Sequence, residues 1–528
     1  MRVLQAFLVS HLLFVSPCSS LPFGSRTKKE VEEQEKKEQQ LSSQDDATRK
    51  EKVSVRGAAS KVFTTNESQP VTSDESSPHK PIETFFLSPP SDEDASLAVK
   101  KEIQTLANST SMQHFLSTTR RSLHRHPEIM YQESFTSEII QDILTELDIS
   151  YTTGWAKNIH QDVYPGPGGY GIVAHIGTQS EDQPCIILRA DMDALPIEES
   201  TKGIQEFKSL AKGKMHACGH DGHTTMLLGA AALLKNVEAS IQGTIRLVFQ
   251  PAEEGGAGGK RMVEEGVVSL SPPAQHAFGM HVWPTLPTGS IASRPGPLLA
   301  AAETFLITIE GRGGHAAMPH LTIDPLVTAS SLIMNLQTII SRNVSPLASG
   351  VVSVTAINAG DAFNVIPASA VIKGTVRALS TEMLMELRDK VEHITQSTAA
   401  LYGCNSTISY SPDFYPPTVN DATLFQWSKT VGAMVSKEGY LRDIEPTMGG
   451  EDFSFLAETI PSTFFLVGQG SGGDEKYHLP RTDYGLHHPS FALDEEVMPI
   501  GVELHANLAL RSLKKLAHEN DGISTEEL

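Results

Sequence analysis

The feature that most constrains the fold is a series of short apolar runs that alternate with a segment of helical composition. The runs Gly171–Ile176, Cys185–Leu188 and Thr244–Phe249 predict strands, two of them buried enough to lie in a central sheet. Between two of these strands, the Ala- and Leu-rich segment Thr224–Leu234 predicts a helix. Because strands that alternate with helices are typical of α/β proteins, we expect an α/β sandwich.

A second pattern interrupts the first from about residue 299. Its predicted elements are the strands Phe305–Ile309, Val351–Ala356 and Ala370–Val376 and the helices Asp324–Ser341 and Met383–Tyr402. The apolar run Phe464–Val467 and a helix after Asp494 then return to the first pattern. We therefore predict a small α+β domain at residues 299–413, inserted into a larger domain made of residues 109–298 and 414–528.

The first 108 residues differ from the rest of the chain. Arg2 precedes the apolar stretch Val3–Val15, and small residues follow, which is typical of a signal peptide over residues 1–20. This stretch is too short to span a bilayer, and no later stretch is long and apolar enough to do so. Residues 21–108 are rich in Lys, Glu, Gln and Ser, so we predict a disordered leader. We therefore expect a protein that is secreted or that stays in the secretory pathway, for example in the endoplasmic reticulum. The alternatives are a disordered start and a targeting signal for another organelle.

Charge and cysteine content narrow the functional classes. The formal net charge of −21 would repel a polyanion, so nucleic acid is not an expected partner, whereas small substrates respond to the local charge of their site. Removal of a signal peptide that contains Cys18 leaves Cys185, Cys218 and Cys404. This odd number implies at least one free thiol or metal-bound thiolate, unless the chain pairs with another.

Histidine and cysteine gather in the segment Met215-His-Ala-Cys-Gly-His-Asp-Gly-His223. Thiolate and imidazole groups this close together form a ligand set suited to a zinc-like ion. The intervening glycine lets the backbone turn sharply, so that Cys218 and His220 can face one point. A structural role explains a single histidine well, but it explains such a cluster poorly.

Three further segments carry polar groups at predicted strand ends or in the loops that follow, where α/β sheets bind their ligands. In Gln250-Pro-Ala-Glu-Glu-Gly-Gly256, one carboxylate could bind a metal while its neighbour takes a proton from water. His281 in Gly279-Met-His-Val-Trp-Pro284 would fit equally well as a buried core histidine. The pair of histidines in Leu486-His-His-Pro-Ser-Phe491 is ambiguous when considered alone.

The predicted insert contributes two more sets of polar side chains. His315 lies on the glycine-rich turn Gly311-Arg-Gly-Gly-His-Ala-Ala317, and Asn364 and Arg377 flank a predicted strand. Imidazole, amide and guanidinium groups suit the binding of a substrate carboxylate and of a developing oxyanion. On the sequence alone, ordinary turn and surface positions explain these side chains equally well.

Taken together, these segments resemble the M20 metallopeptidase family. More narrowly, they are similar to its amidohydrolase branch, which includes auxin–amino acid conjugate hydrolases, hippurate hydrolases and N-acyl amino acid amidohydrolases. The motifs that carry the resemblance are Leu188-Arg-Ala-Asp-Met-Asp-Ala-Leu-Pro-Ile197, Met215–His223, Gln250–Gly255, Gly279–Pro284 and Gly311–His320. The resemblance implies an α/β fold, with a catalytic three-layer sandwich on a mixed sheet and an inserted α+β lid that also forms a homodimer.

The resemblance also implies roles for individual residues. Two divalent ions, zinc or manganese, would be held by Cys218, His220, Glu254, His281 and His487. The substrate would be held by Asn364, Arg377, Gly449 and Gly450. Glu253 would act as the general base, His315 would stabilise the tetrahedral intermediate, within the chain or across a dimer, and Asp191 and Asp193 would orient a metal ligand. His487 is preferred to His488 because the family places this ligand two residues before the proline.

The implied function is metal-dependent hydrolysis of N-acyl amino acids to a carboxylic acid and a free amino acid. A dipeptidase or carboxypeptidase of the same family would use the same ions with a different acyl pocket. A secreted metal- or ligand-binding protein without activity is a further alternative, although such a protein has no use for Glu253. One departure concerns the metal: Cys218 stands where other branches of the family bridge their ions with Asp, and a thiolate favours zinc.

Overall fold

The computed structural model describes residues 49–62, 92–470 and 480–520. The predicted signal peptide lies outside the described residues, and so do residues 21–48 and 63–91 of the predicted leader. From Lys52 onward, the described residues belong to one structural unit.

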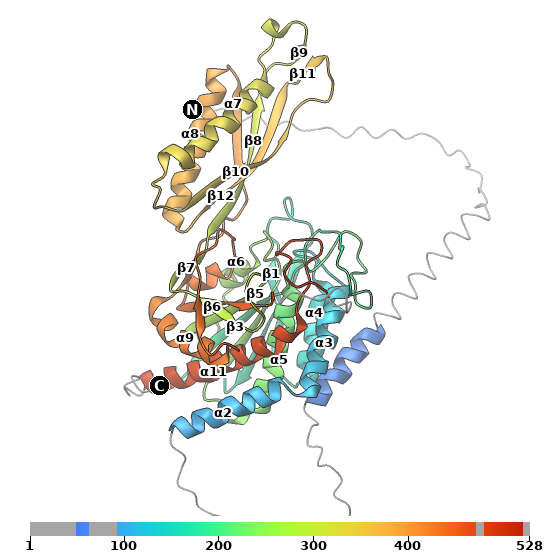
Figure 1. Cartoon of the computed structure of the whole chain (residues 1–528), viewed down its shortest axis with the longest axis vertical. Coiled ribbons are helices and arrows are strands. Elements are labelled where there is room, and N and C mark those ends of the chain that lie inside the picture. The colour runs from blue at the N-terminus through green and yellow to red at the C-terminus, as the bar shows by residue number, and fades with distance from the viewer. Residues whose placement is uncertain (1–48, 63–91, 471–479, 521–528) are drawn as a thin grey trace, which may run out of the picture. The chain divides into compact units, whose positions relative to one another are not determined.

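The larger domain is built on an eight-stranded mixed sheet with the strand order β1-β2-β4-β3-β5-β16-β6-β15 (Figure 1). Its strands are β1 (Ser150–Lys157), β2 (Gly168–Gly177), β3 (Cys185–Asp191), β4 (Thr244–Gln250), β5 (His276–Trp283), β6 (Ile291–Ser293), β15 (Leu441–Asp443) and β16 (Ser462–Gly468). The central strands β4, β3, β5 and β16 run parallel, whereas β1 and β2 pair antiparallel at one edge. Every residue of β3, β4 and β16 is buried, as expected for strands covered on both faces.

Helices cover both faces of this sheet and give it three layers. Alternate residues of β3 point to opposite sides: Ile186 and Leu188 belong to one hydrophobic cluster, and Cys185 and Ile187 belong to another. The first cluster includes residues of α3 (Thr110–Arg125), α4 (Ser134–Glu146), α5 (His220–Asn236), α9 (Ala422–Val435) and α11 (Met498–Asn520). The second includes residues of α6 (Gly258–Glu264) and α10 (Ser454–Ala457). In the described part of the chain, no helix has both the length and the apolar character needed to cross a membrane.

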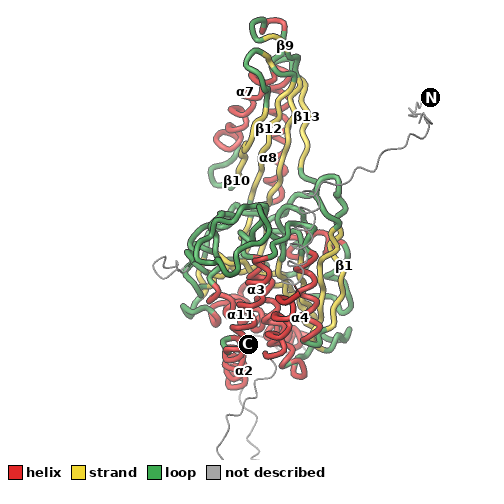
Figure 2. Tube along the Cα trace, turned by 90° about the vertical axis from the view of Figure 1, so that its right-hand side faces the viewer, coloured by secondary structure: helices red, strands yellow, loops and turns green. Residues whose placement is uncertain are grey.

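The insert is a four-stranded antiparallel sheet with the order β10-β12-β8-β13, covered on one face by two helices (Figure 2). Its elements are β8 (Ala301–Glu310), α7 (Pro325–Thr338), β10 (Gly350–Asn358), β12 (Ser369–Ala378), α8 (Thr381–Leu401) and β13 (Asn405–Tyr410). The Asp-Pro pair starts α7 as predicted, because the Asp324 side chain accepts the N–H groups of Leu326 and Val327. Beyond the end of β8, the short strands β9 (Gly314–His315) and β11 (Val365–Ile366) pair with each other.

The predicted fold class is confirmed: a mixed-sheet α/β domain carries a smaller inserted α+β domain. The chain enters and leaves the insert close to a second pair of short strands, β7 (Gly296–Leu299) and β14 (Thr418–Asn420). All strands and helices predicted from the apolar runs overlap observed elements, although their ends differ by a few residues.

Two segments of the predicted disordered leader are helical in the structure. Residues 52–62 form a helix, and α2 spans Asp92–Ala107. Among the side chains of these helices that the structure describes, the buried ones are Val55, Ala58, Ala59, Val62, Ile103 and Ala107. The structure differs here from the predicted disorder because a few small and branched apolar residues at helical spacing suffice once a neighbouring surface covers them.

Candidate metal centre and active site

The segment rich in histidine and cysteine forms the turn that leads into α5. Gly219 has a left-handed backbone with φ of +95°, and a Cβ atom there would lie 2.5 Å from the side chain of Val282. Both the turn and the close approach therefore require glycine. Cys218 and His220, on either side of it, are buried and point into one region.

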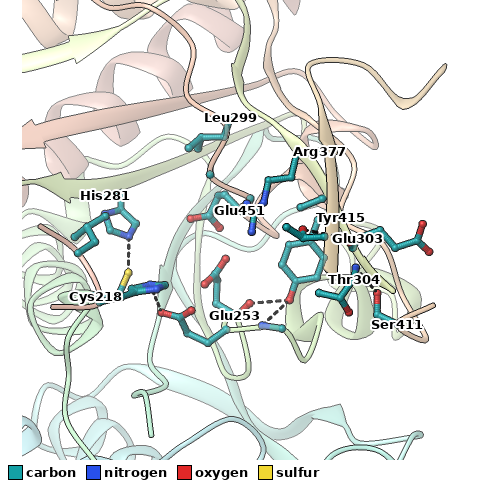
Figure 3. A pocket seen from close by; sticks show the side chains of 18 of the residues that line it. Cys218, Glu253, His281, Leu299, Glu303, Thr304, Arg377, Ser411, Tyr415 and Glu451 are labelled. Carbon is teal, nitrogen blue, oxygen red and sulfur yellow. Dashed lines mark hydrogen bonds and ion pairs between the residues drawn. The ribbon is translucent and has the colours of Figure 1, made fainter. Parts of the chain in front are cut away.

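His281 meets Cys218 from β5. Its Nε2 lies 3.3 Å from Cys218 Sγ (Figure 3), and its Nδ1–H donates to the carbonyl oxygen of Val282 at 2.7 Å. Burial, together with the nearby His223, lowers the pKa of His281 well below its ordinary value. The ring is therefore neutral, and the lone pair of Nε2 is directed toward the cysteine.

His487 and Glu254 meet on another side of the cluster. The backbone of His487 has a positive φ of 63°, and its N–H donates to the carbonyl oxygen of Ala217 at 2.8 Å. His487 Nε2 lies 3.1 Å from Glu254 Oε1. His488 instead stacks on Tyr484, with ring centroids 4.5 Å apart. Of the two adjacent histidines, the structure thus places His487 at the site.

The five predicted ligands come together in two overlapping groups. Ligand atoms of Cys218, His220 and His281 lie within 4.8 Å of one another, and so do those of Cys218, Glu254 and His487. Because Cys218 belongs to both groups, its thiolate is placed to contact two ions. His220 Nε2 is buried and has no hydrogen-bond partner, which leaves its lone pair available to an ion.

The charges around the cluster favour a divalent cation. Burial and two neighbouring glutamates raise the pKa of Cys218 well above its ordinary value, so the thiol needs a nearby cation to ionise. Burial alone would lower the pKa of His220, but Asp191 and Asp193 raise it to about 10, and a metal ion would replace the proton held there. Thiolate, imidazole and carboxylate groups suit a borderline ion such as zinc, so these residues fit a pair of divalent ions.

Glu253 lies beside these ligands in the wall of a pocket of about 590 Å³ (Figure 3). Ligand atoms of Glu253, His220 and Glu254 fall within 4.8 Å of one another, and Glu253 Oε1 accepts the N–H of Asp452 at 3.4 Å. Burial, together with Glu451 and Glu254, raises the pKa of Glu253 well above its usual range. A carboxyl group with a raised pKa is suited to accept and release a proton near neutral pH.

Asp191 and Asp193 both support the cluster, through different partners. Asp193 Oδ1 lies 3.3 Å from His220 Nδ1, and its two carboxylate oxygens accept the N–H groups of Glu253 and of the next residue at 3.0 and 2.9 Å. Asp193 therefore joins the turn before α5 to the loop of paired glutamates. Asp191 Oδ1 lies 2.7 Å from Nδ1 of His223, a residue to which sequence reasoning assigned no role.

Sequence reasoning also missed Arg189, a buried arginine in β3. Its guanidinium donates to Gln250 at 2.8 Å, to Asp191 at 2.8 Å and to Asp452 at 2.7 Å, and it lies 3.0 Å from Glu451. It neutralises part of the acidic cluster and joins β3 to the loop that precedes α10. The sequence feature that could have identified Arg189 is a cationic residue within an apolar strand, because a buried charge requires partners.

Three of the four predicted substrate-binding residues line the same pocket. Arg377 lies there (Figure 3) together with Gly449 and Gly450, and its guanidinium donates to the carbonyl oxygen of Met448 at 2.8 Å. Large apolar side chains also line the pocket: Met130, Trp283, Leu299, Leu466 and Leu486. The pocket thus combines one cationic group with apolar walls next to the candidate metal ligands.

His315 and Asn364 are absent from the lining of this pocket. Both side chains are exposed at the paired strands β9 and β11, where the N–H of Ala316 donates to the carbonyl oxygen of Asn364 at 3.0 Å. The ten-residue strand β8 begins at the pocket and leads to this tip over about 30 Å. One chain therefore brings His315 and Asn364 to each other but not to Glu253.

Comparison with known proteins agrees with this geometry. Residues 187–511, more than half of the chain, match the model of peptidase family M20/M25/M40. The chain belongs to this family. As an M20 protein it is a metal-dependent amidohydrolase, and the family resemblance inferred from its motifs is confirmed.

Individual relatives cover most of this M20 chain. It is 42% identical to IAA-amino acid hydrolase ILR1-like 4 of Arabidopsis thaliana over 79% of this chain and 90% of the relative. It is 37% identical to N-acetylcysteine deacetylase of Bacillus subtilis over 76% of this chain and 97% of the relative. Among solved structures, the Bacillus subtilis YXEP protein, a dinuclear metal binding peptidase from the M20 family, matches with a TM-score of 0.60 at 34% identity, over 77% of this chain and 99% of that one.

Proposed function

We propose that this enzyme hydrolyses the amide bond of N-acyl amino acids, with Glu253 as the general base. The observation that carries the proposal is the position of Glu253, between the candidate metal ligands and a pocket that also contains Arg377. Two of the relatives are named for amino acid conjugates of this kind, an IAA-amino acid hydrolase and an N-acetylcysteine deacetylase.

The chemistry divides between the bound ions and the side chains of the chain. Two divalent ions held by Cys218 and its partner ligands would polarise the substrate carbonyl and lower the pKa of the attacking water. Glu253 would remove a proton from that water and later deliver it to the nitrogen of the departing amine. Its raised pKa suits both transfers. The Asp193 carboxylate accepts the backbone N–H of Glu253, and the backbone N–H of Asp452 donates to the Glu253 carboxylate.

Substrate recognition would use both the cationic Arg377 and the apolar side chains that line the pocket. Arg377 would bind the carboxylate of the amino acid, since a guanidinium group can donate two parallel hydrogen bonds to a carboxylate. Apolar side chains such as Trp283 and Leu486 would contact the acyl group. Together, these walls favour an amino acid that carries an apolar acyl group.

His315 and Asn364 would complete the site from a second copy of the chain. Within one chain they lie on an exposed tip, where an imidazole has no reacting group to contact. Exposed apolar residues surround them, namely Met318, Phe363 and Val365. Because exposed apolar residues near polar ones are typical of interaction surfaces, they support a homodimer in which His315 stabilises the oxyanion.

The nearest alternative is a dipeptidase or carboxypeptidase with the same metal site, and a non-catalytic binding protein is a further one. We would load the purified protein with zinc or manganese and assay acetyl-, benzoyl- and indoleacetyl-amino acids beside dipeptides. We expect turnover of acyl amino acids to exceed that of dipeptides. Preference for dipeptides would favour the peptidase, and a protein that holds two ions yet hydrolyses neither would favour the binding protein.

Two finer points of the proposal need separate measurements. The Cys218 thiolate favours zinc, with manganese as the alternative, and a metal titration of the activity would decide between them. The apolar stretch near the N-terminus favours entry into the secretory pathway, which fusion of residues 1–20 to a reporter would test.

A further inference from the structure

The loop that carries the paired glutamates has an unusual backbone. Ala252 and Ala257 have positive φ values of 59° and 54°, and Gly255 between them has a φ of 95°. Residues other than glycine rarely adopt this left-handed conformation, because the Cβ atom crowds the backbone. Contacts with surrounding groups must therefore hold the loop in this shape.

Side chains from several segments supply these contacts. Asp193 accepts two N–H groups from the loop, and Glu133 accepts the N–H of Ala252 at 2.9 Å. The phenol of Tyr415 makes three more hydrogen bonds. Its O–H donates to the carbonyl oxygen of Glu253 at 2.7 Å (Figure 3), and its oxygen accepts the N–H groups of Gly255 at 3.1 Å and Ala257 at 2.9 Å. One donor and two acceptor sites are the full capacity of a hydroxyl group.

Tyr415 itself lies on the segment that returns from the insert. This segment follows β13, and Tyr415 pairs with Ala302 of β8 through two backbone hydrogen bonds of 2.9 Å each. The ring of Tyr415 is nearly buried, with 8% of the residue exposed, and lines the pocket beside Glu253. Tyr415 thus connects two parts of the molecule: its backbone pairs with β8 at the base of the insert, and its side chain bonds the glutamate loop.

We propose that Tyr415 is a positioning residue, which holds Glu253 in its reactive place by tying the glutamate loop to the base of the insert. The inference rests on the proposed role of Glu253 as general base. Tyr415 need not touch the substrate or an ion, because it acts through the three backbone groups that it bonds.

The test is Tyr415→Phe in the metal-loaded, full-length enzyme, a change that removes the hydroxyl and keeps the ring. We expect kcat to fall about 10- to 100-fold while KM stays within about threefold, because the base is displaced but the substrate walls remain. Metal content, measured by elemental analysis, should be unchanged. Deuterium exchange of peptides that cover residues 251–258 should become faster in the variant.

Tyr410→Phe is the matched control, since the Tyr410 hydroxyl also bonds a backbone carbonyl, that of Arg388, but within the insert. Unchanged kcat in Tyr415→Phe, or an equal loss in Tyr410→Phe, would overturn the inference. If Tyr415→Phe does not fold, exchange in the wild-type protein decides, because unprotected amides at residues 255 and 257 would contradict the bonds to Tyr415. An active Glu253→Gln variant would overturn the proposed base itself, whichever result Tyr415→Phe gives.

Discussion

The metal-ligand cluster and the tip of the insert both place histidine beside glycine, yet their surroundings differ. Around Cys218, imidazole, thiolate and carboxylate groups from four separate segments meet in a site that is buried except at His487 and Glu254. At the tip, His315 and Asn364 are exposed, and the N–H of Ala317 donates to the His315 ring at 3.1 Å. Similar local motifs therefore have different settings: the first forms a site within one chain, and the second leaves its side chains exposed.

Glu253→Gln tests whether the site around Cys218 depends on Glu253 for catalysis. We expect kcat to fall by about 10²- to 10⁴-fold, because the amide cannot accept a proton from water. Elemental analysis should find the metal content unchanged, since Glu253 is not among the proposed ligands. Glu310→Gln, an exposed change in the insert, is the control and should retain full activity. Retained turnover in Glu253→Gln would remove Glu253 from the role of base.

At the exposed tip, His315→Ala should lower kcat about 10²- to 10³-fold, the usual cost of losing a donor to an oxyanion. If His315 acts across a dimer, mixing this variant with Glu253→Gln creates one complete site in each mixed dimer. Random exchange of equal amounts should then restore about one quarter of the wild-type activity. An inactive mixture, after subunit exchange has been verified, would contradict action across a dimer.

Cys218→Ser should lower the metal affinity of the site around Cys218 and leave the exposed tip of the insert unchanged. Replacing the shared thiolate should weaken metal binding by about 10- to 100-fold and lower activity in proportion to the metal lost. Metal content after dialysis against a weak chelator gives the measurement. Cys404→Ser is the matched control, because Cys404 is buried in the core of the insert. Full metal content in Cys218→Ser would exclude this residue from the site.

The smallest effect is expected in the helix of residues 52–62, whose buried side chains contribute to stability and not to the site. Val55 in the helix of residues 52–62 is 1% exposed, whereas Val53 in the same helix is 65% exposed. Val55→Ala should lower the free energy of unfolding by about 1–2 kcal/mol, and Val53→Ala should leave it nearly unchanged. Chemical denaturation measures both, and kcat should not change in either variant. Equal stability of the two variants would mean that this helix does not pack on the core in solution.

Much of the site could be predicted because its chemistry is concentrated in short segments. The ligands Cys218 and His220 stand in one cluster, and Glu253 follows a strand whose apolar character is plain. Arg189 and Tyr415 were missed, since each is a single residue most of whose partners lie far away in the sequence. The folded helix at residues 52–62 escaped prediction for a related reason, because its few apolar residues count only when another surface covers them.

By itself, the sequence determined the order of strands and helices, the fold class and the family, because periodicity and contiguous motifs are local properties. Only the tertiary structure decided which polar groups meet. It set Arg189 among Asp191, Glu451 and Asp452, paired Asp191 with His223, and left His315 outside the pocket of its own chain. The physical reason is that contacts between distant residues depend on how the sheet, the loops and the insert pack together, which spacing along the chain does not specify.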